Sequence, residues 1–169
     1  MMNDIEIRKA EDGEIDVLMA IYLDKVRWLR GRGTPMWDES QFTRESLKDK
    51  YLDPEYYVAV KDGEIIGGFI LLEYDGRYWP ENGADDAYYF HKFVIKHEYC
   101  GKGYSGRILR WVQAYAGAQG KRFLRLDFDE RRTYLKNMYL SNGFIPKDKK
   151  PNEKGTLVTK AEYIIGTSS

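Results

Sequence analysis

One stretch, from Phe90 to Leu109, constrains the fold of this 169-residue chain more than any other. It begins with a β-prone apolar run that ends at Ile95, continues through a polar connection and a glycine-rich turn, and enters an amphipathic helix near Tyr104. Glycines let the backbone approach a ligand closely, and the N-terminus of a helix offers free N–H groups and a favourable dipole to an anion. The stretch therefore predicts a strand–turn–helix unit that binds a phosphate-bearing cofactor.

The rest of the chain alternates between the periodicities of helices and strands. The predicted elements are a strand over residues 5–8, helices over 15–29 and 43–52, a hairpin over 56–60 and 65–72, and a strand over 123–128. A helix marked by residues 134–139 stops at Asn142-Gly143, a strand opens at residues 144–145, and a last strand covers 161–165. An Asp-Gly pair between two β-rich runs is a hairpin signal. This order of elements predicts a mixed α/β fold with hairpins and a parallel crossover, in one domain over residues 1–169.

Charge and composition exclude several classes of protein. Lysine plus arginine and aspartate plus glutamate both number 27, and this balance argues against binding to bulk nucleic acid or to an anionic membrane. No signal peptide and no apolar run of membrane-spanning length is visible. The single cysteine, Cys100, has no partner for an intrachain disulfide, so we expect a cytoplasmic protein.

An acidic loop separates the hairpin from the central stretch. It carries aromatic residues and five acids, which are Glu73, Asp75, Glu81, Asp85 and Asp86. Two interpretations remain open: a solvated connection, or a lip over a pocket for a cationic acceptor. Met36, Trp37 and Tyr74 are candidates for the acceptor pocket, with ordinary packing as the alternative. The lysines from Lys147 to Lys154 are interpreted as a solvated hairpin tip.

The glycine turn also matches a dinucleotide fingerprint. Gly101, Gly103 and Gly106 satisfy G-x-G-x-x-G, and Asp127 follows about 20 residues later. Residues 96–100 separate the turn from the strand, however, and too little chain follows Asp127 for the six-stranded sheet of that fold. A Walker loop is excluded because a glycine follows Lys102. A dinucleotide-dependent oxidoreductase is therefore kept as the less favoured alternative.

Two segments resemble the motifs of the GNAT N-acetyltransferase superfamily. Residues 95–109 resemble its acetyl-coenzyme A motif, which reads Arg or Gln, two residues, Gly, one residue, then Gly or Ala. Residues 126–128 and 138–144 resemble its second motif, a strand followed by a helix that ends in Tyr, three residues and Gly-Phe. The similarity extends over nearly the whole chain to Phe144, since residues 28–37 and the hairpin are also similar to what many members carry.

The resemblance implies a fold and a reaction. The fold is a mostly antiparallel, twisted sheet of six to seven strands with a central parallel pair that splays apart, together with about four helices. The reaction is transfer of an acetyl group from acetyl-coenzyme A to a primary amine, by direct attack of the amine on the thioester. A non-catalytic acyl-coenzyme A-binding or regulatory module is the second alternative.

Three positions depart from the family pattern. Cys100 stands where Arg or Gln is usual, which removes one side-chain contact to the cofactor. Ser105 replaces a Gly or Ala, but it is small and keeps its backbone N–H. Arg132 stands where members often have asparagine, and it either reaches the phosphates of the cofactor or lies exposed.

The resemblance also implies a set of cofactor contacts. The pyrophosphate would lie on the N–H groups of the glycine turn, with Lys102 and Arg107 adding positive charge. A backbone N–H near Val94 or Ile95 would hold the oxyanion that forms on the thioester carbonyl. The residues expected at the cofactor are Phe93, Val94, Ile95, Cys100, Gly101, Lys102, Gly103, Tyr104, Ser105, Gly106, Arg107 and Arg132.

Acetyl transfer to an amine needs a proton acceptor for the amine and a proton donor for the thiolate. Tyr139 matches the position of the acid in the family. His91 and Asp127 are candidates for the base, Asp129 could hold the substrate ammonium, and a chain of water molecules is an alternative base. A covalent role for Cys100 is disfavoured, and the spacing of His91, His97 and Cys100 matches no metal-ligand framework.

The identity of the acceptor and the oligomeric state stay open. The acceptor is expected to be a small-molecule or peptide amine, such as a polyamine, an amino acid, an aminoglycoside or a protein terminus. The sequence leaves open whether two copies form a homodimer.

Overall fold

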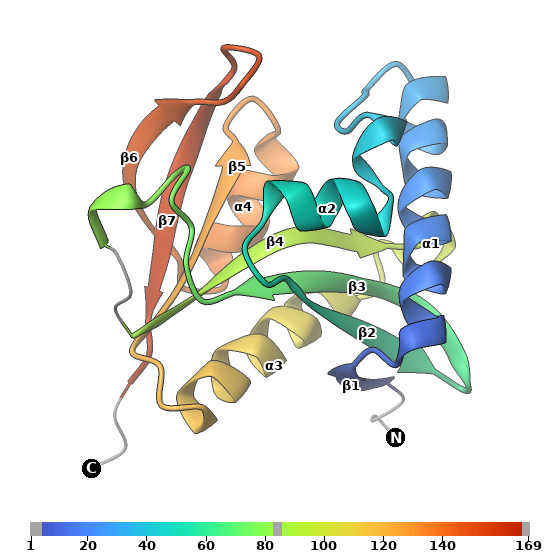
Figure 1. Cartoon of the computed structure of the whole chain (residues 1–169), viewed down its shortest axis with the longest axis horizontal. Coiled ribbons are helices and arrows are strands. Elements are labelled where there is room, and N and C mark those ends of the chain that lie inside the picture. Colours follow the sequence, from blue (N-terminus) through green and yellow to red (C-terminus); the bar gives the residue numbers. More distant parts are fainter. Residues whose placement is uncertain (1–4, 83–85, 167–169) are drawn as a thin grey trace. The chain divides into compact units, whose positions relative to one another are not determined.

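The computed structural model describes residues 5–82 and 86–166 (Figure 1). Residues 1–4, where no signal peptide is expected, and Asp85 of the acidic loop lie outside the described residues. Within these residues, seven strands form one mixed sheet in the order β1-β2-β3-β4-β5-β7-β6, and β4 and β5 are parallel. Together with four α-helices in the described part of the chain, this sheet confirms the predicted fold class.

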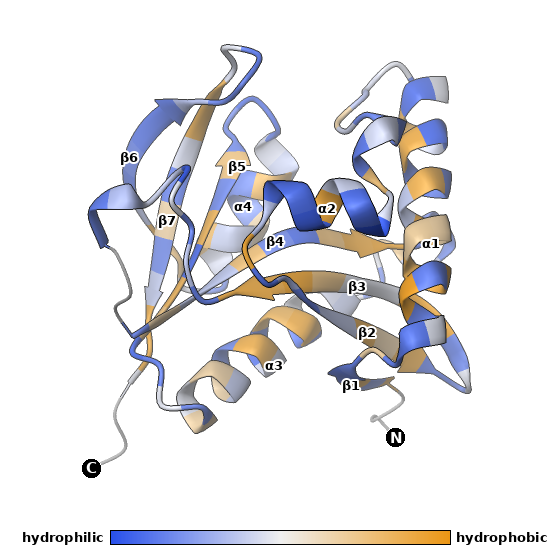
Figure 2. Ribbon diagram, in the orientation of Figure 1, coloured by the Kyte–Doolittle hydropathy of each residue, from blue (hydrophilic) through white to orange (hydrophobic). Residues whose placement is uncertain are grey.

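The elements follow one another along the chain. The strands are β1 (Ile5–Lys9), β2 (Glu55–Lys61), β3 (Glu64–Leu72), β4 (Ala87–Ile95), β5 (Phe123–Asp129), β6 (Ile145–Pro151) and β7 (Leu157–Ile164). The α-helices are α1 (Asp12–Gly31), α2 (Arg44–Lys50), α3 (Tyr104–Ala118) and α4 (Thr133–Ser141). The lysine-rich segment is a strand at its start and a turn only at its end. The exposed, hydrophilic strand β6 is an edge strand (Figure 2), where lysines discourage pairing with another chain.

The chain divides into two compact units. The first contains the residues up to Leu72 together with Lys92–Tyr104, and the second contains Glu73–His91 together with the residues from Ser105 onward. Within the described residues, no helix is long and apolar enough to cross a membrane.

In the first unit, α1 buries the apolar face that its sequence predicts, including Leu18, Tyr22 and Val26. The β2–β3 hairpin turns at Asp62 and Gly63, whose φ angles of 49° and 80° explain the Asp-Gly pair. Strand β3 approaches the end of β4 so closely that a Cβ on Gly67 would lie 2.2 Å from the carbonyl oxygen of Val94. Glycine is therefore required there by close backbone packing.

Strand β4 is irregular at Lys92. This residue has a φ of 54°, which is uncommon for a residue with a side chain, and the hydroxyl of Tyr22 donates a hydrogen bond of 2.5 Å to its carbonyl oxygen. The irregularity comes directly after His91. Residues with a side chain and a positive φ are conformationally strained, and such positions cluster at functional sites.

In the second unit, the parallel register runs from Ala87–Phe123 to Tyr89–Arg125, whereas β4 and β5 both continue beyond it. Tyr88 stacks on Tyr115 of α3, so alternation along β4 directs Tyr89 and His91 to the opposite face. The same alternation along β5 gives Arg125 and Asp127 one common face. The register of β5 with β7 pairs them with Glu162 and Lys160, respectively, and the sheet of this unit thus has one strongly polar face.

Candidate active site

The glycine turn has the conformation that an anion-binding site needs. Gly101 and Gly103 have φ angles of 75° and 85°, and a Cβ added at either would meet nothing within 4 Å. Glycine is required here by the backbone conformation rather than by crowding. Helix α3 begins at Tyr104, directly after the turn, so the backbone N–H groups of its first turn adjoin an open, glycine-lined segment. The predicted cradle residues therefore fit a pyrophosphate group.

A lysine stands beside the position where the motif departs from its family. The amino group of Lys25, from α1, lies 3.5 Å from the sulfur of Cys100 in the first unit. The cysteine is exposed, whereas the lysine is buried. A cation is thus present next to the position at which Arg or Gln is usual, and no pattern in the sequence indicated it.

The other predicted cofactor residues differ in exposure. Val94 and Ile95 are buried on β4, while Phe93 is half-buried. Lys102 is exposed, and Ser105, Gly106, Arg107 and Arg132 are half-buried. Arg132 is the residue that precedes α4, so its backbone starts that helix. Its contact with a cofactor stays a prediction.

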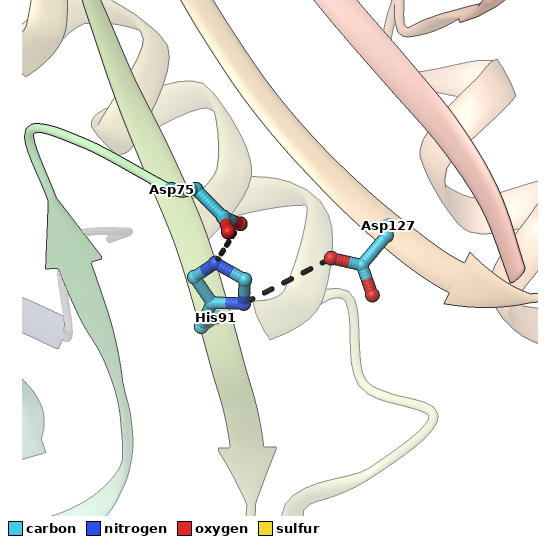
Figure 3. A group of neighbouring side chains, drawn as sticks. All are labelled: Asp75, His91 and Asp127. Carbon is cyan, nitrogen blue, oxygen red and sulfur yellow. Dashed lines mark hydrogen bonds and ion pairs between the residues drawn. The ribbon is translucent and has the colours of Figure 1, made fainter. Parts of the chain in front are cut away.

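His91 lies between two aspartates in the second unit (Figure 3). Its Nε2 atom is 2.9 Å from Oδ2 of Asp75, and its Nδ1 atom is 4.0 Å from Oδ2 of Asp127. The exposed side-chain fractions are 8% for His91, 5% for Asp75 and 16% for Asp127. The predicted bases His91 and Asp127 are therefore brought together in a nearly enclosed site, and the aspartate from the acidic loop joins them.

Three elements position this group. His91 lies on β4, two residues beyond Tyr89. Asp127 lies on β5, two residues beyond Arg125, the partner of Tyr89 in the register. The parallel register thus brings the two residues side by side. Asp75 lies in the loop after β3, and its other carboxylate oxygen accepts backbone hydrogen bonds from Arg77 and Tyr78.

These contacts determine the charge of Asp75. Burial by itself raises the pKa of an aspartate, but the hydrogen bond and charge of His91, with the two backbone N–H groups, hold the pKa of Asp75 below its ordinary value. Asp75 is therefore a carboxylate at neutral pH. Its contribution to stability is present above the pKa of an unfolded aspartate and is lost as the pH falls through the lowered pKa.

Two tyrosines in the second unit have a pKa above the ordinary value, in part because of the charge of Asp127. Burial, followed by the charge of Asp127, raises the pKa of Tyr78 to about 12. Burial also raises the pKa of Tyr139, with smaller contributions from Tyr134 and Asp127. The ring of Tyr139 packs against Phe128 at 5.5 Å. Tyr139 consequently keeps its proton at neutral pH, and its hydroxyl can donate a hydrogen bond.

The acidic loop is held by cations of its own chain. Glu73 pairs with Lys121 at 2.7 Å, and Glu81 pairs with Lys160 at 2.9 Å. With Asp75 hydrogen-bonded to His91, three acids of this loop have partners within the second unit. Much of the negative charge expected to attract a cationic acceptor is thus used to fasten the loop to the sheet.

The predicted acceptor-pocket residues fall into different surroundings. Trp37 packs edge-on against Tyr22 and Phe42 in the first unit, and Met36 beside it is half-buried. Tyr74 is 38% exposed. The carboxylate of Asp129 forms an ion pair of 2.8 Å with the guanidinium of Arg131. The carboxylate that we expected to hold a substrate ammonium group is thus paired with a cation of its own chain. A surface depression lined by Glu130, Arg131 and residues 154–157 contains none of the predicted site residues.

The model of the acetyltransferase (GNAT) family matches residues 22–144, which include β2 to α4 and the glycine turn. No curated protein sequence matches the chain. The matched residues cover most of the chain and contain the cradle, His91, Asp127 and Tyr139.

Solved structures share the fold at low sequence identity. A GNAT family acetyltransferase from Elizabethkingia anophelis with acetyl-CoA bound is 16% identical, with a TM-score of 0.69 over 96% of this chain and 99% of that chain. Spermidine N-acetyltransferase from Vibrio cholerae, in complex with CoA and spermine, is 14% identical, with a TM-score of 0.68 over 96% of each chain. The ribosomal-protein-S18-alanine N-acetyltransferase from Escherichia coli is 13% identical, with a TM-score of 0.68 over 98% of this chain and 96% of that chain. The chain belongs to the GNAT acetyltransferase family.

Proposed function

We propose that this N-acetyltransferase, which uses acetyl-coenzyme A, acetylates a primary amine of a small molecule or peptide by direct attack on the thioester. The observation that carries the proposal is the position of His91 between the carboxylates of Asp75 and Asp127, in the same compact unit as the buried side chain of Tyr139. A proton acceptor and a proton donor are the two groups that this chemistry requires. Family membership and the geometry of the glycine turn support the identity of the acetyl donor.

The cofactor is proposed to bind along the segment from Phe93 to Arg107. The N–H groups of residues 101–106 would receive the pyrophosphate, with positive charge from Lys102 and Arg107. The backbone N–H of Val94 or Ile95 would donate to the thioester oxygen as negative charge develops there. A backbone donor in a strand is fixed before the reaction, which makes it effective for this purpose.

The proton transfers follow from the site. Acetyl-coenzyme A supplies a thioester whose carbonyl carbon forms a C–N bond to the amine while its C–S bond breaks. The ammonium of the acceptor first loses one proton to His91, which passes it to solvent. The attacking nitrogen loses a second proton to solvent as the amide forms. The departing sulfur gains a proton from the hydroxyl of Tyr139, and the phenolate recovers one from solvent. The net products are the amide, the thiol and one released proton.

Replacing Tyr139 with phenylalanine is expected to lower kcat about 10- to 100-fold, because the thiolate loses its proton donor. The Kd of acetyl-coenzyme A should change little, since the aromatic packing against Phe128 is kept. The matched control is Tyr134→Phe, on the same helix and 66% exposed, which should retain wild-type turnover. Wild-type turnover in Tyr139→Phe would remove this residue from the mechanism.

The class of acceptor amine is proposed from the residues around His91 rather than from the number of acids in the loop. Solved proteins of this fold include a spermidine N-acetyltransferase and a ribosomal-protein-S18-alanine N-acetyltransferase. Because three of the five acids of the loop are paired within the chain, we do not expect a strong preference for amines with several positive charges. Asp127 supplies one carboxylate, which suits a single ammonium group.

An amine screen tests the proposed function. Release of free thiol from acetyl-coenzyme A would be measured with a panel of polyamines, amino acids, aminoglycosides and peptides. Acetyl-coenzyme A should also protect the protein against thermal unfolding, whereas NAD should not. Protection without amine-dependent thiol release would favour a non-catalytic acyl-coenzyme A-binding module. Protection by NAD would favour the oxidoreductase.

We further propose a cytoplasmic location and a single acetyltransferase domain over residues 1–169. The one exposed cysteine is compatible with a reducing compartment. Sedimentation of the purified protein would show whether it forms a homodimer.

A further inference from the structure

The hydrogen bond between Asp75 and His91 determines which ring nitrogen of the histidine carries a proton. A carboxylate can only accept, so Nε2, 2.9 Å from Asp75 Oδ2, must be the donor. In the neutral imidazole the lone pair then lies on Nδ1. Figure 3 shows that this second nitrogen is directed toward Asp127.

We propose that Asp75 is a positioning residue that makes Nδ1 of His91 the proton acceptor, and that Nδ1 and Asp127 hold the ammonium group of the acceptor amine between them. This inference rests on the proposed function and adds to it the position of the amine and the role of the loop aspartate. One N–H bond of the ammonium breaks as a new N–H bond forms at Nδ1. Asp75 remains anionic throughout and stabilises the imidazolium cation that results.

The distance between the two acceptor atoms supports this position. Nδ1 and Asp127 Oδ2 are 4.0 Å apart, which is too long for a direct hydrogen bond. A nitrogen placed about 2.9 Å from both atoms would lie to one side of the line between them and could donate to each. The ammonium group of the substrate amine can donate one N–H to the imidazole and another to the carboxylate. This arrangement prepares the proton transfer and neutralises the charge of the amine against Asp127.

The same three residues could also be considered as metal ligands, since their donor atoms lie within 4.8 Å of one another. The two aspartates, however, approach different nitrogens of the imidazole ring. A single ion bound to one ring nitrogen would therefore have only one of these carboxylates beside it. The geometry suits a carboxylate–imidazole pair that faces a second carboxylate better than a metal centre.

The first test determines the tautomer and is independent of turnover. The chain has two histidines, so ¹⁵N-labelled His97→Gln protein would show the two ring nitrogens of His91 alone. At a pH where the ring is neutral, Nε2 should be protonated and Nδ1 unprotonated. Asp75→Asn should change this, because an amide can donate to Nε2 and stabilise the other tautomer. A proton on Nδ1 in the wild-type background would overturn the inference even if the enzyme is active.

The second test is kinetic and uses the best amine of the screen. Asp75→Asn should lower kcat about 100-fold or more and move the acidic limb of the pH profile to lower pH, because the imidazolium loses its anionic neighbour. The KM for acetyl-coenzyme A should not change. The titratable groups to be considered around His91 are Asp75 and Tyr78 of the loop, Asp127 of β5 and Tyr139 of α4.

A matched control separates positioning from loop attachment. Glu81→Gln weakens another contact of the same loop, to Lys160, without altering a partner of His91. It should leave kcat and the pH profile unchanged, whereas Asp127→Asn should raise the KM of the amine about 10-fold or more. Equal losses in Glu81→Gln and Asp75→Asn, with an unshifted pH profile, would show a structural role for Asp75 and contradict the proposal. Absence of turnover in the wild type with every amine would contradict the proposed function and leave the tautomer result to decide on Asp75.

Discussion

Gly103→Glu is expected to abolish binding of acetyl-coenzyme A, with Kd rising about 1,000-fold. Two effects combine at this position. The φ of 85° is unfavourable for any residue with a side chain, and the new carboxylate would face the pyrophosphate across the open side of the turn. Like charges in contact cost several kcal/mol, and about 4 kcal/mol corresponds to this change in Kd. Isothermal titration calorimetry of the purified variant measures the effect.

A control variant separates the two effects of Gly103→Glu, which are backbone strain and loss of the pyrophosphate-binding turn. Gly155, in the turn between β6 and β7, has a φ of 79° and equally open surroundings. Gly155→Glu should therefore show a comparable loss of stability but bind acetyl-coenzyme A with wild-type affinity. If Gly103→Glu also bound with wild-type affinity, the glycine turn would not be the pyrophosphate site.

Arg125→Met is expected to destabilise the second unit by about 3–5 kcal/mol. The guanidinium is 3% exposed, lies 2.7 Å from the carboxylate of Glu162 and donates to the hydroxyl of Tyr89 at 2.8 Å. Its loss leaves Glu162 buried, with the more distant Lys147 at 3.7 Å as a weaker partner. Removing one member of a buried ion pair typically costs this amount because the remaining charge is uncompensated. Urea unfolding followed by circular dichroism measures the change.

The double variant Arg125→Met with Glu162→Leu is the corresponding control. Removal of both charges should restore most of the lost stability, because apolar side chains of similar volume can replace a buried ion pair. A single variant as stable as the wild type would show that the pair contributes little. Arg125 and Tyr89 form the last pair in the β4–β5 register before His91 and Asp127. Arg125→Met should for this reason also reduce turnover.

Much of the fold could be predicted because its signals are local. The Asp-Gly hairpin, the apolar face of α1 and the glycine turn before α3 each depend on residues close in sequence. The strand character of residues 147–151 was missed because its lysines resemble those of a solvated turn. Pairing with β7 determines their structure instead, and this pairing is not visible in the local pattern.

The candidate site could be predicted only in part, because contacts between segments far apart in the sequence are not visible in a local pattern. His91, Asp127 and Tyr139 were expected from their chemistry and from the motifs, but their arrangement depends on the parallel register of β4 and β5. Asp75 was recognised as one acid among five in a loop, and nothing near it in the sequence indicates that it reaches His91. Lys25 beside Cys100 and Arg131 on Asp129 are likewise contacts that a linear pattern does not contain.

Transfer of an isotopically labelled acetyl group tests the central claim most directly. Acetyl-coenzyme A labelled in its acetyl group would be incubated with the protein and the preferred amine, and both products and the intact protein would be analysed by mass spectrometry. We expect one labelled amide for each free coenzyme A thiol, with no labelled protein, because the amine attacks the thioester directly. Binding of acetyl-coenzyme A without a labelled amide, or accumulation of labelled protein at Cys100, would contradict this account.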